Sequence, residues 1–134
     1  MQAQGDTYWG MLINRGVQRF FLLSALHRRP MHGYELARSI KEACAGCCGP
    51  TDAMIYPALR DLLEGGYAVC HDETVTGRHR KVCCLTEKGE EAYRTAAGAW
   101  QRVLGPLVEA VQTALDASPQ GATCCPAATK GDQE

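Results

Sequence analysis

The chemistry that this sequence offers most clearly is that of thiols. Eight cysteines occur in 134 residues, and six of them stand in adjacent pairs at Cys47-Cys48, Cys83-Cys84 and Cys124-Cys125. Clustered thiolates are soft ligands that select zinc, cadmium, mercury, copper(I) or a metalloid such as trivalent arsenic or antimony. A single cysteine is commonly just a small apolar core residue, and that interpretation covers isolated Cys70 but not three pairs. The pairs therefore indicate a site for a thiophilic ion.

The spacing of the cysteines narrows the kind of ion. A tetrahedral zinc site prefers two C-x2-C pairs, and Cys44 with Cys47 supplies only one of them. Adjacent cysteines suit a two- or three-coordinate ion better, because side chains at neighbouring positions diverge. We therefore expect a soft metal or metalloid as effector, such as As(III), Sb(III), Hg or Cd, and no organic cofactor. The preferred site combines a loop cluster with a pair near the C-terminus: Cys44, Cys47, Cys48, Cys124 and Cys125.

A second candidate site lies in a predicted β-hairpin. Cys70 falls opposite Cys83 or Cys84 if the turn centres on Thr76-Gly77, which would bring the Cβ atoms to about 5 Å. Because Cys83 and Cys84 point to opposite faces of a strand, only one of them can share a site with Cys70. Vicinal or cross-strand cysteines can also oxidise to disulfides, so a redox sensor is the alternative to a metal sensor.

Positive charge is concentrated in one short segment. Arg78, Arg80 and Lys81 stand within five residues, although the formal net charge of the chain is only -1 and the pI is about 6.4. Such a composition argues against a nonspecific polycation. Binding to a polyanion such as DNA must then rest on a local basic face.

Apolar periodicity predicts three helices in the first half of the chain. They cover about 8–27, 33–44, and a segment that begins at Thr51 or Asp52 and ends at Gly65-Gly66. Residues 44–50 contain two glycines and a proline and are expected to form a loop. Pro57 is tolerated only in the first turn of a helix, so it predicts a helix start a few residues upstream.

The second half is expected to contain a hairpin and a long helix. Two β-type runs, over about 67–74 and 80–85, flank the turn. The helical tract that follows is about 40 Å long at 1.5 Å per residue, and Gly105-Pro106 should kink it. One small domain cannot cover its apolar stripe, so a second copy of the chain should bury part of it. The predicted dimer interface consists of Tyr93, Trp100, Leu104, Leu107 and Val111.

Three motifs then occur in order: HGYEL at 32–36, IYPALRDLLEGGYA at 55–68, and GRHRK followed by LTEKG at 77–89. Over about residues 16–96 this set resembles the PadR family of winged-helix transcriptional repressors. The resemblance implies a mostly α fold with a small β-hairpin, a winged helix-turn-helix plus a long C-terminal dimerisation helix. Residues 1–86 would form the winged-helix DNA-binding domain, 87–117 the dimerisation helix, and 118–134 a flexible cysteine-containing tail. His79 stands where the family often has proline, and the cysteine set is not part of the family pattern.

The resemblance also implies which residues meet DNA. In a helix-turn-helix, the N-terminal residues of the second helix face base edges in the major groove. The basic residues of the wing would reach backbone phosphate or the adjacent minor groove. The predicted DNA-binding residues are Thr51, Asp52, Met54, Tyr56, Arg60, Arg78, His79, Arg80 and Lys81.

We therefore expect a homodimeric, DNA-binding transcriptional repressor that is released from its operator when thiolates capture a soft metal or metalloid. The alternatives are a thiol-based redox sensor and a PadR-like repressor that senses a small aromatic molecule in the dimer cavity, with Trp9, Trp100 and Tyr93 as walls. No catalytic triad, phosphate-cradling glycine loop or carboxylate pair can be argued, so an enzyme is not expected. A cytoplasmic location without membrane association is expected, because no apolar run approaches the length of a membrane span.

Overall fold

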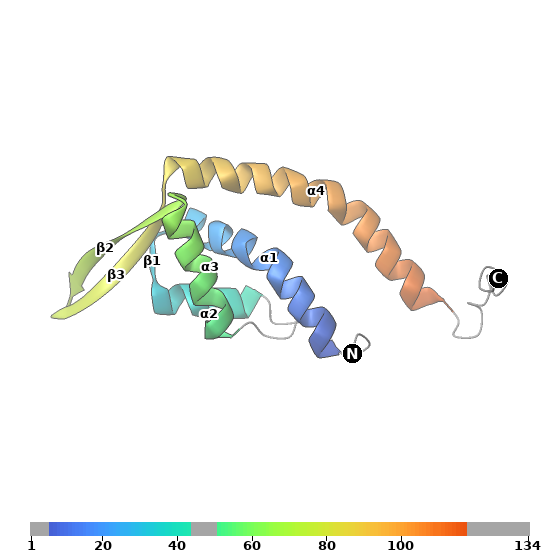
Figure 1. Cartoon of the computed structure of the whole chain (residues 1–134), viewed down its shortest axis with the longest axis horizontal. Helices are drawn as coiled ribbons and strands as arrows, with labels where there is room; N and C mark the ends of the chain where they lie inside the picture. Colours follow the sequence, from blue (N-terminus) through green and yellow to red (C-terminus); the bar gives the residue numbers. More distant parts are fainter. Residues whose placement is uncertain (1–5, 44–50, 118–134) are drawn as a thin grey trace, which may run out of the picture. The chain divides into compact units, whose positions relative to one another are not determined.

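The computed structural model describes residues 6–43 and 51–117. Helices dominate, and a small antiparallel sheet projects beside them (Figure 1). This confirms the mostly α fold with a winged hairpin that the sequence predicts. No described helix is long and apolar enough to cross a membrane. The elements in chain order are α1 (Asp6–Arg28), β1 (Met31–His32), α2 (Gly33–Ala43), α3 (Asp52–Glu64), β2 (Ala68–Val75), β3 (Arg78–Leu85) and α4 (Glu87–Asp116).

The contacts of the chain divide it into two compact units, and the division falls inside α4. The first unit is Met1–Ala97 and the second is Gly98–Glu134. The first turns of α4 therefore pack with the winged-helix elements, whereas the boundary predicted from the sequence lies before this helix. The helix itself continues through Pro106.

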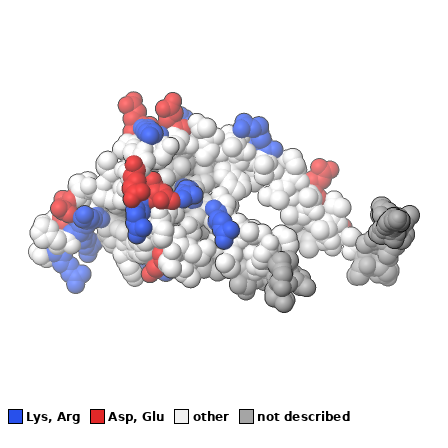
Figure 2. Space-filling view, viewed as in Figure 1, with Lys and Arg blue, Asp and Glu red and all other residues white. Residues whose placement is uncertain are grey.

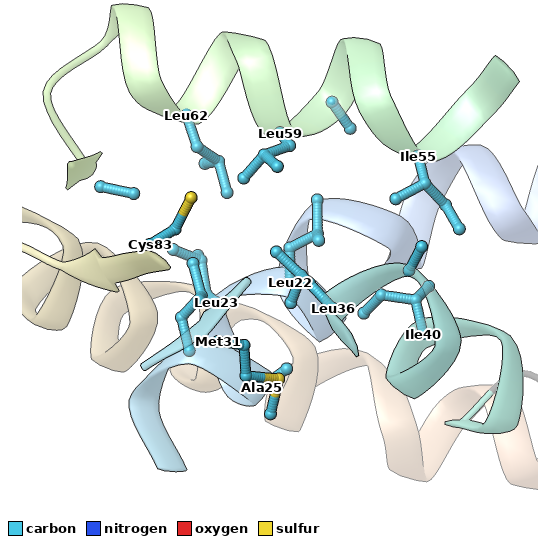
Figure 3. Packing of buried hydrophobic residues seen from close by; sticks show 14 residues of the cluster. Leu22, Leu23, Ala25, Met31, Leu36, Ile40, Ile55, Leu59, Leu62 and Cys83 are labelled. Carbon is cyan, nitrogen blue, oxygen red and sulfur yellow. The ribbon is translucent and has the colours of Figure 1, made fainter. Parts of the chain in front are cut away.

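The core of the first unit is formed where α1, α2 and α3 meet. Leu22, Leu36, Ile40 and Ile55 are almost completely buried there (Figure 3). Each such side chain stabilises the fold by about 1.5–3 kcal/mol relative to exposure. The sheet contributes Cys83, whose side chain enters the same cluster. The root of the hairpin is thus part of the core that holds the helices together.

Helix α3 begins as predicted but contains its proline more deeply than expected. Thr51 is the N-cap residue, and its carbonyl oxygen accepts hydrogen bonds from the backbone N–H groups of Met54 at 2.9 Å and Ile55 at 3.0 Å. Because the helix starts at Asp52, Pro57 is its sixth residue and lies in the second turn. The prediction of a first-turn position was wrong, and packing of α3 against the core outweighs the lost backbone hydrogen bond.

The hairpin has the predicted turn, and it carries an extra strand that the sequence did not reveal. Thr76 and Gly77 have φ values of 50° and 78°, which is the two-residue turn geometry that matches the twist of antiparallel strands. The sheet order is β1-β3-β2, with Met31 of β1 opposite Cys83 of β3. Strand β1 consists only of Met31 and His32 and is too short to show the alternating pattern of a strand. It is recognised as a strand only because it pairs with β3.

Candidate nucleic-acid interface

A basic hollow lies between the start of α2 and the wing formed by β2 and β3. Its volume is about 610 Å³. Lys and Arg side chains gather at this hairpin in the space-filling view, with acidic groups beside them (Figure 2). Four cationic side chains and one carboxylate are among its walls, which comprise His32, Gly33, Tyr34, Glu35, Arg38, Arg78, Arg80 and Lys81.

The single carboxylate of the hollow is neutralised by a neighbour. The Arg29 guanidinium donates to Oε2 of Glu35 at 2.8 Å. This hydrogen bond lowers the pKa of Glu35, and the positive charge of Arg29 adds to the effect against the cost of burial. Within the described part of the chain, Arg78, Arg80 and Lys81 have no ion-pair partner within 4.0 Å. The hollow therefore presents positive charge that an anion such as phosphate could neutralise.

The HGYEL motif builds the α2 side of the hollow. Nδ1 of His32 accepts a hydrogen bond from the backbone N–H of Glu35 at 3.4 Å, so His32 braces the first turn of α2. The imidazole also lies nearly parallel to the Tyr34 ring, at 6.3 Å between centroids, and the Arg38 guanidinium lies 5.8 Å from the centroid of the Tyr34 ring. Tyr34 is 67% exposed, so an aromatic and cationic surface faces solvent here.

Arg38 was not among the residues predicted to bind DNA. It follows Tyr34 by four residues and therefore occupies the same face of α2. That spacing was readable in the sequence. What the sequence could not give is the approach of the wing to this face, which joins Arg38 to Arg78, Arg80 and Lys81.

The predicted residues of α3 divide between two sides of the helix. Asp52 and Tyr56 line a smaller hollow against α2, about 240 Å³ in volume, which shares Tyr34 and Arg38 with the basic hollow. Met54 instead faces α1, where it lines a separate hollow. Thr51 and Arg60 are exposed to solvent. The structure therefore joins Asp52 and Tyr56 to the basic surface and directs Met54 elsewhere.

Asp52 is also engaged in an ion pair that links the two helices. Nζ of Lys41 lies 2.8 Å from its Oδ1, and this hydrogen bond raises the pKa of Lys41. Residues 44–50, which connect α2 to α3, lie between these two partners in the sequence. The pair thus connects the last turn of α2 to the first residue of α3.

The wing alternates positive and negative residues across its two strands. Arg80 lies opposite Glu73 and Lys81 lies opposite Asp72 in the register. His79 and Arg78 are exposed near the turn. The two acids were not predicted as part of the DNA face, because only the strand register reveals which acids stand beside the basic residues. They reduce the net positive charge of the wing.

Only one of the adjacent cysteines Cys83 and Cys84 pairs with Cys70, as the alternation of side chains along a strand predicts. Cys70 and Cys83 are directly opposite each other and form a disulfide, with 3.9 Å between their Cα atoms. Cys84 lies opposite Val69, carries a free thiol and is partly buried. No cluster of three or more His, Cys, Asp or Glu side chains suited to a metal ion occurs among residues 6–43 and 51–117. The predicted ligands Cys44, Cys47, Cys48, Cys124 and Cys125 all lie outside these ranges.

The residues predicted at the dimer interface fall into the two units of the chain. Tyr93 belongs to the first unit, where its hydroxyl donates to Oγ of Ser24 at 3.1 Å and its ring lies 5.5 Å from that of Phe20. In the second unit, Trp100 borders an apolar hollow of about 330 Å³. The large apolar side chains of this unit that are about half exposed or more are Val103, Leu104, Leu107, Val108, Val111 and Leu115.

Three packed helices, of which α2 and α3 form the helix pair, and a basic hairpin whose cations lie beside the start of α2 together define a winged-helix DNA-binding protein. The sequence pattern of the PadR-like family of transcriptional regulators matches residues 22–95. The chain belongs to this family.

Solved structures with the same fold come from several bacteria. A PadR family transcription regulator from Clostridium difficile is 18% identical, with a TM-score of 0.63 over 71% of this chain and 98% of that one. A PadR family transcriptional regulator from Eggerthella lenta is 26% identical, with a TM-score of 0.59 over 75% of this chain and 83% of that one. A Streptococcus transcriptional regulator is 25% identical, with a TM-score of 0.63 over 75% and 96% of the two chains. No curated protein matches the chain.

Proposed function

We propose that this protein is a repressor that binds operator DNA as a homodimer. The observation that carries the proposal is the hollow in which four cationic side chains, Arg38, Arg78, Arg80 and Lys81, converge from α2 and the wing. Cations held in such a groove neutralise backbone phosphates, and this contact fixes the register of a reading helix on the duplex. Helix α3 would enter the major groove beside it, with Arg60 as the exposed cation available to a guanine edge or a phosphate.

Substitutions distinguish contacts to backbone phosphates from contacts to base edges. Loss of a phosphate contact, expected for Arg78→Ala or Arg80→Ala, should weaken binding to all sequences similarly and lower the salt slope by about 1. Loss of a base contact, tested with Arg60→Ala, should cost about 1–3 kcal/mol and relax specificity at one position. Fluorescence anisotropy with duplexes selected from a random pool measures both effects. Affinities that are indifferent to all three substitutions would remove the winged-helix assignment of the DNA face.

The release of DNA is proposed to occur when cysteine thiolates capture a thiophilic metal or metalloid. Cys44, Cys47 and Cys48 immediately precede Thr51, the N-cap of α3, so a bound ion there would act on the start of the reading helix. An effector shifts the DNA equilibrium only through unequal affinity for two conformations, and a coupling of about 1–3 kcal/mol changes occupancy about 5- to 150-fold. Cys124 and Cys125 would complete this site from the C-terminal segment.

A thiol-based redox switch is the second candidate, and the Cys70–Cys83 bond favours it. Two thiols would lose two protons and two electrons to a hydroperoxide, which is reduced to an alcohol and water as the S–S bond forms. Cys83 belongs to the hydrophobic core and pairs with β1 as well as β2, so its oxidation state acts on the root of the wing.

One set of variants distinguishes the two triggers. Under strict reduction, arsenite should release DNA from the wild type but not from Cys47→Ser/Cys48→Ser, while both proteins bind DNA equally without arsenite. If a redox switch operates instead, peroxide should release DNA from the wild type and from that double variant, but not from Cys70→Ser. Cys84→Ser is the matched control, because Cys84 is the neighbouring free thiol. With all eight cysteines replaced by serine, release by arsenite would overturn the metal trigger, and release by peroxide would overturn the redox trigger.

A further inference from the structure

The ion pair between Lys41 and Asp52 borders the basic surface. Both residues line the hollow of about 240 Å³ between α2 and α3, which shares Tyr34 and Arg38 with the basic hollow. The side chains of Lys41 and Asp52 are 46% and 60% exposed. Ion pairs that are exposed to this extent add little stability, because solvent screens their charges. Both groups are therefore open to a ligand that approaches this surface.

Asp52 occupies the part of α3 that would meet base edges. It is the first residue of the helix, and helix-turn-helix proteins present the N-terminal residues of the second helix to the major groove. A carboxylate on its own would repel the phosphates on both sides of the groove. Lys41, in the last turn of α2, compensates this charge at 2.8 Å. The hydrogen bond to Asp52 raises the pKa of Lys41, so the ammonium stays charged.

The pair presents an acceptor and a donor side by side. A carboxylate has about four acceptor sites, and an ammonium has three donor hydrogens. Each group can therefore form further hydrogen bonds besides the one that the two share. A partner that satisfies both must carry a donor next to an acceptor. Their separation must be close to the 2.8 Å between Nζ of Lys41 and Oδ1 of Asp52.

The major-groove edge of a C·G base pair has this arrangement. Cytosine presents its N4 amino group as a donor, and guanine presents O6 and N7 as acceptors. A base-pair hydrogen bond joins cytosine N4 to guanine O6, so these two atoms lie about 2.9 Å apart. An A·T pair also has a donor beside an acceptor, but the thymine methyl group lies next to that acceptor. Contact with the methyl group would remove water from the Lys41 ammonium without a hydrogen bond in return.

We infer that the Lys41–Asp52 pair reads one C·G base pair in each half-site of the operator. The Asp52 carboxylate accepts from N4 of cytosine, and the Lys41 ammonium donates to O6 or N7 of guanine. Arg38 and the basic residues of the wing hold the phosphates, which carry no sequence information. The inference rests on the proposed DNA binding and adds the identity of a base pair that the protein recognises.

The test is a selection of binding duplexes from a random pool with the full-length protein. Wild type should enrich sequences that have C·G at one position of each half-site. Replacing that base pair by A·T should lower affinity about 5- to 150-fold in fluorescence anisotropy. Asp52→Asn should change the preference at this position from C·G to A·T, because an asparagine amide pairs with N6 and N7 of adenine. An ion pair with only a structural role could not produce this change.

Two further variants complete the test, and circular dichroism establishes that each is folded. Lys41→Met removes the donor to guanine, so its preference for C·G over A·T should fall about tenfold relative to wild type. The matched control is Glu64→Gln, which removes the same charge as Asp52→Asn from the exposed far end of α3. It should select the same bases as wild type.

The inference is wrong if Asp52→Asn selects the wild-type bases at every position. It is also wrong if Lys41→Met weakens binding to all sequences by the same factor, since the ammonium would then contact a phosphate. In both cases the sequence-specific binding of wild type leaves the proposed function intact. If wild type enriches no sequence from the pool, the proposed function and the inference fail together.

Discussion

Among the described residues whose buried side-chain polar atoms lack a hydrogen-bond partner, Asn14 is the least exposed. It is 1% exposed, and neither its Oδ1 nor its Nδ2 has a partner among the described residues. Desolvation of an unpaired amide costs about 1–3 kcal/mol. Apolar periodicity predicted the helix over about 8–27, but a polar side chain such as Asn14 carries no apolar signal, so its burial in the core could not be predicted from the sequence.

We predict that Asn14→Leu raises the free energy of unfolding by about 1–2 kcal/mol, because an apolar side chain of similar size removes the desolvation cost. Urea denaturation followed by circular dichroism measures the change. Ser39→Ala on α2 provides a comparison at a partly buried polar position outside this cluster. A stability loss in Asn14→Leu would mean that the amide has a partner that stabilises the fold.

The ion pair of Arg29 with Glu35 makes a pH-dependent contribution. The hydrogen bond from Arg29 lowers the pKa of Glu35 below its ordinary value of 4.5. A carboxyl group whose pKa is lower in the folded state stabilises the fold above the unfolded pKa. This stability is lost as the pH falls through the folded pKa. Because the pair is partly exposed, its contribution should be small.

The expected result is therefore a difference between wild type and Glu35→Gln that is present at pH 6 and shrinks below about pH 4.5. Thermal unfolding across pH 3 to 6 measures it. Glu64→Gln at the exposed end of α3 is the control, because no ion pair involves Glu64 in the described ranges. A wild-type to Glu35→Gln difference that does not change with pH would contradict the assigned role of the charge.

At the scale of elements, the sequence predicted what local signals determine. The turn at Thr76-Gly77 and the start of α3 at Asp52 follow from turn residues and apolar spacing, and both are found. Strand β1 could not be predicted, since its two residues become a strand only through pairing with β3. The same reason explains why Arg38 was missed and why the choice between Cys83 and Cys84 as the partner of Cys70 stayed open. Each depends on register or on an approach between distant segments.

The strand register of the wing leads to a further prediction. It places Asp72 opposite Lys81 and Glu73 opposite Arg80. If the wing contacts DNA, these carboxylates oppose the phosphates and lower affinity. Asp72→Asn/Glu73→Gln should therefore tighten DNA binding several-fold at low salt, with less effect at high salt because ions screen exposed charges. Anisotropy titrations at two salt concentrations measure the effect.

The matched control for the wing variant is Glu91→Gln, which removes an exposed acid on α4 outside the hairpin. A general effect of net charge would tighten DNA binding in both proteins by similar factors for each charge removed. Equal tightening would therefore argue that the wing does not lie close to the phosphate backbone.

At the scale of the whole molecule, we predict that the chain dimerises through the second unit. Leu104, Leu107 and Val111 follow each other at helical spacing, and each is about half exposed in the single chain. Apolar rows of this kind on a helix are usually covered by another helix. Leu104→Asp would place an unpaired charge in such a contact and should yield a monomer in analytical ultracentrifugation. The control is Gln101→Asp, which adds the same charge at an exposed polar position of the same helix.

Dimerisation and DNA recognition are linked, because two reading helices must meet half-sites about 34–36 Å apart on one face of the duplex. A monomeric Leu104→Asp protein keeps its own α3 and wing, so it should still bind a single half-site. It should lose the added affinity for a duplex with two half-sites, since the second contact is no longer intramolecular. Wild type should prefer the two-site duplex over a one-site duplex by at least about tenfold, and Leu104→Asp should bind both alike. If Leu104→Asp remains a dimer with the wild-type preference, the interface lies outside this apolar row.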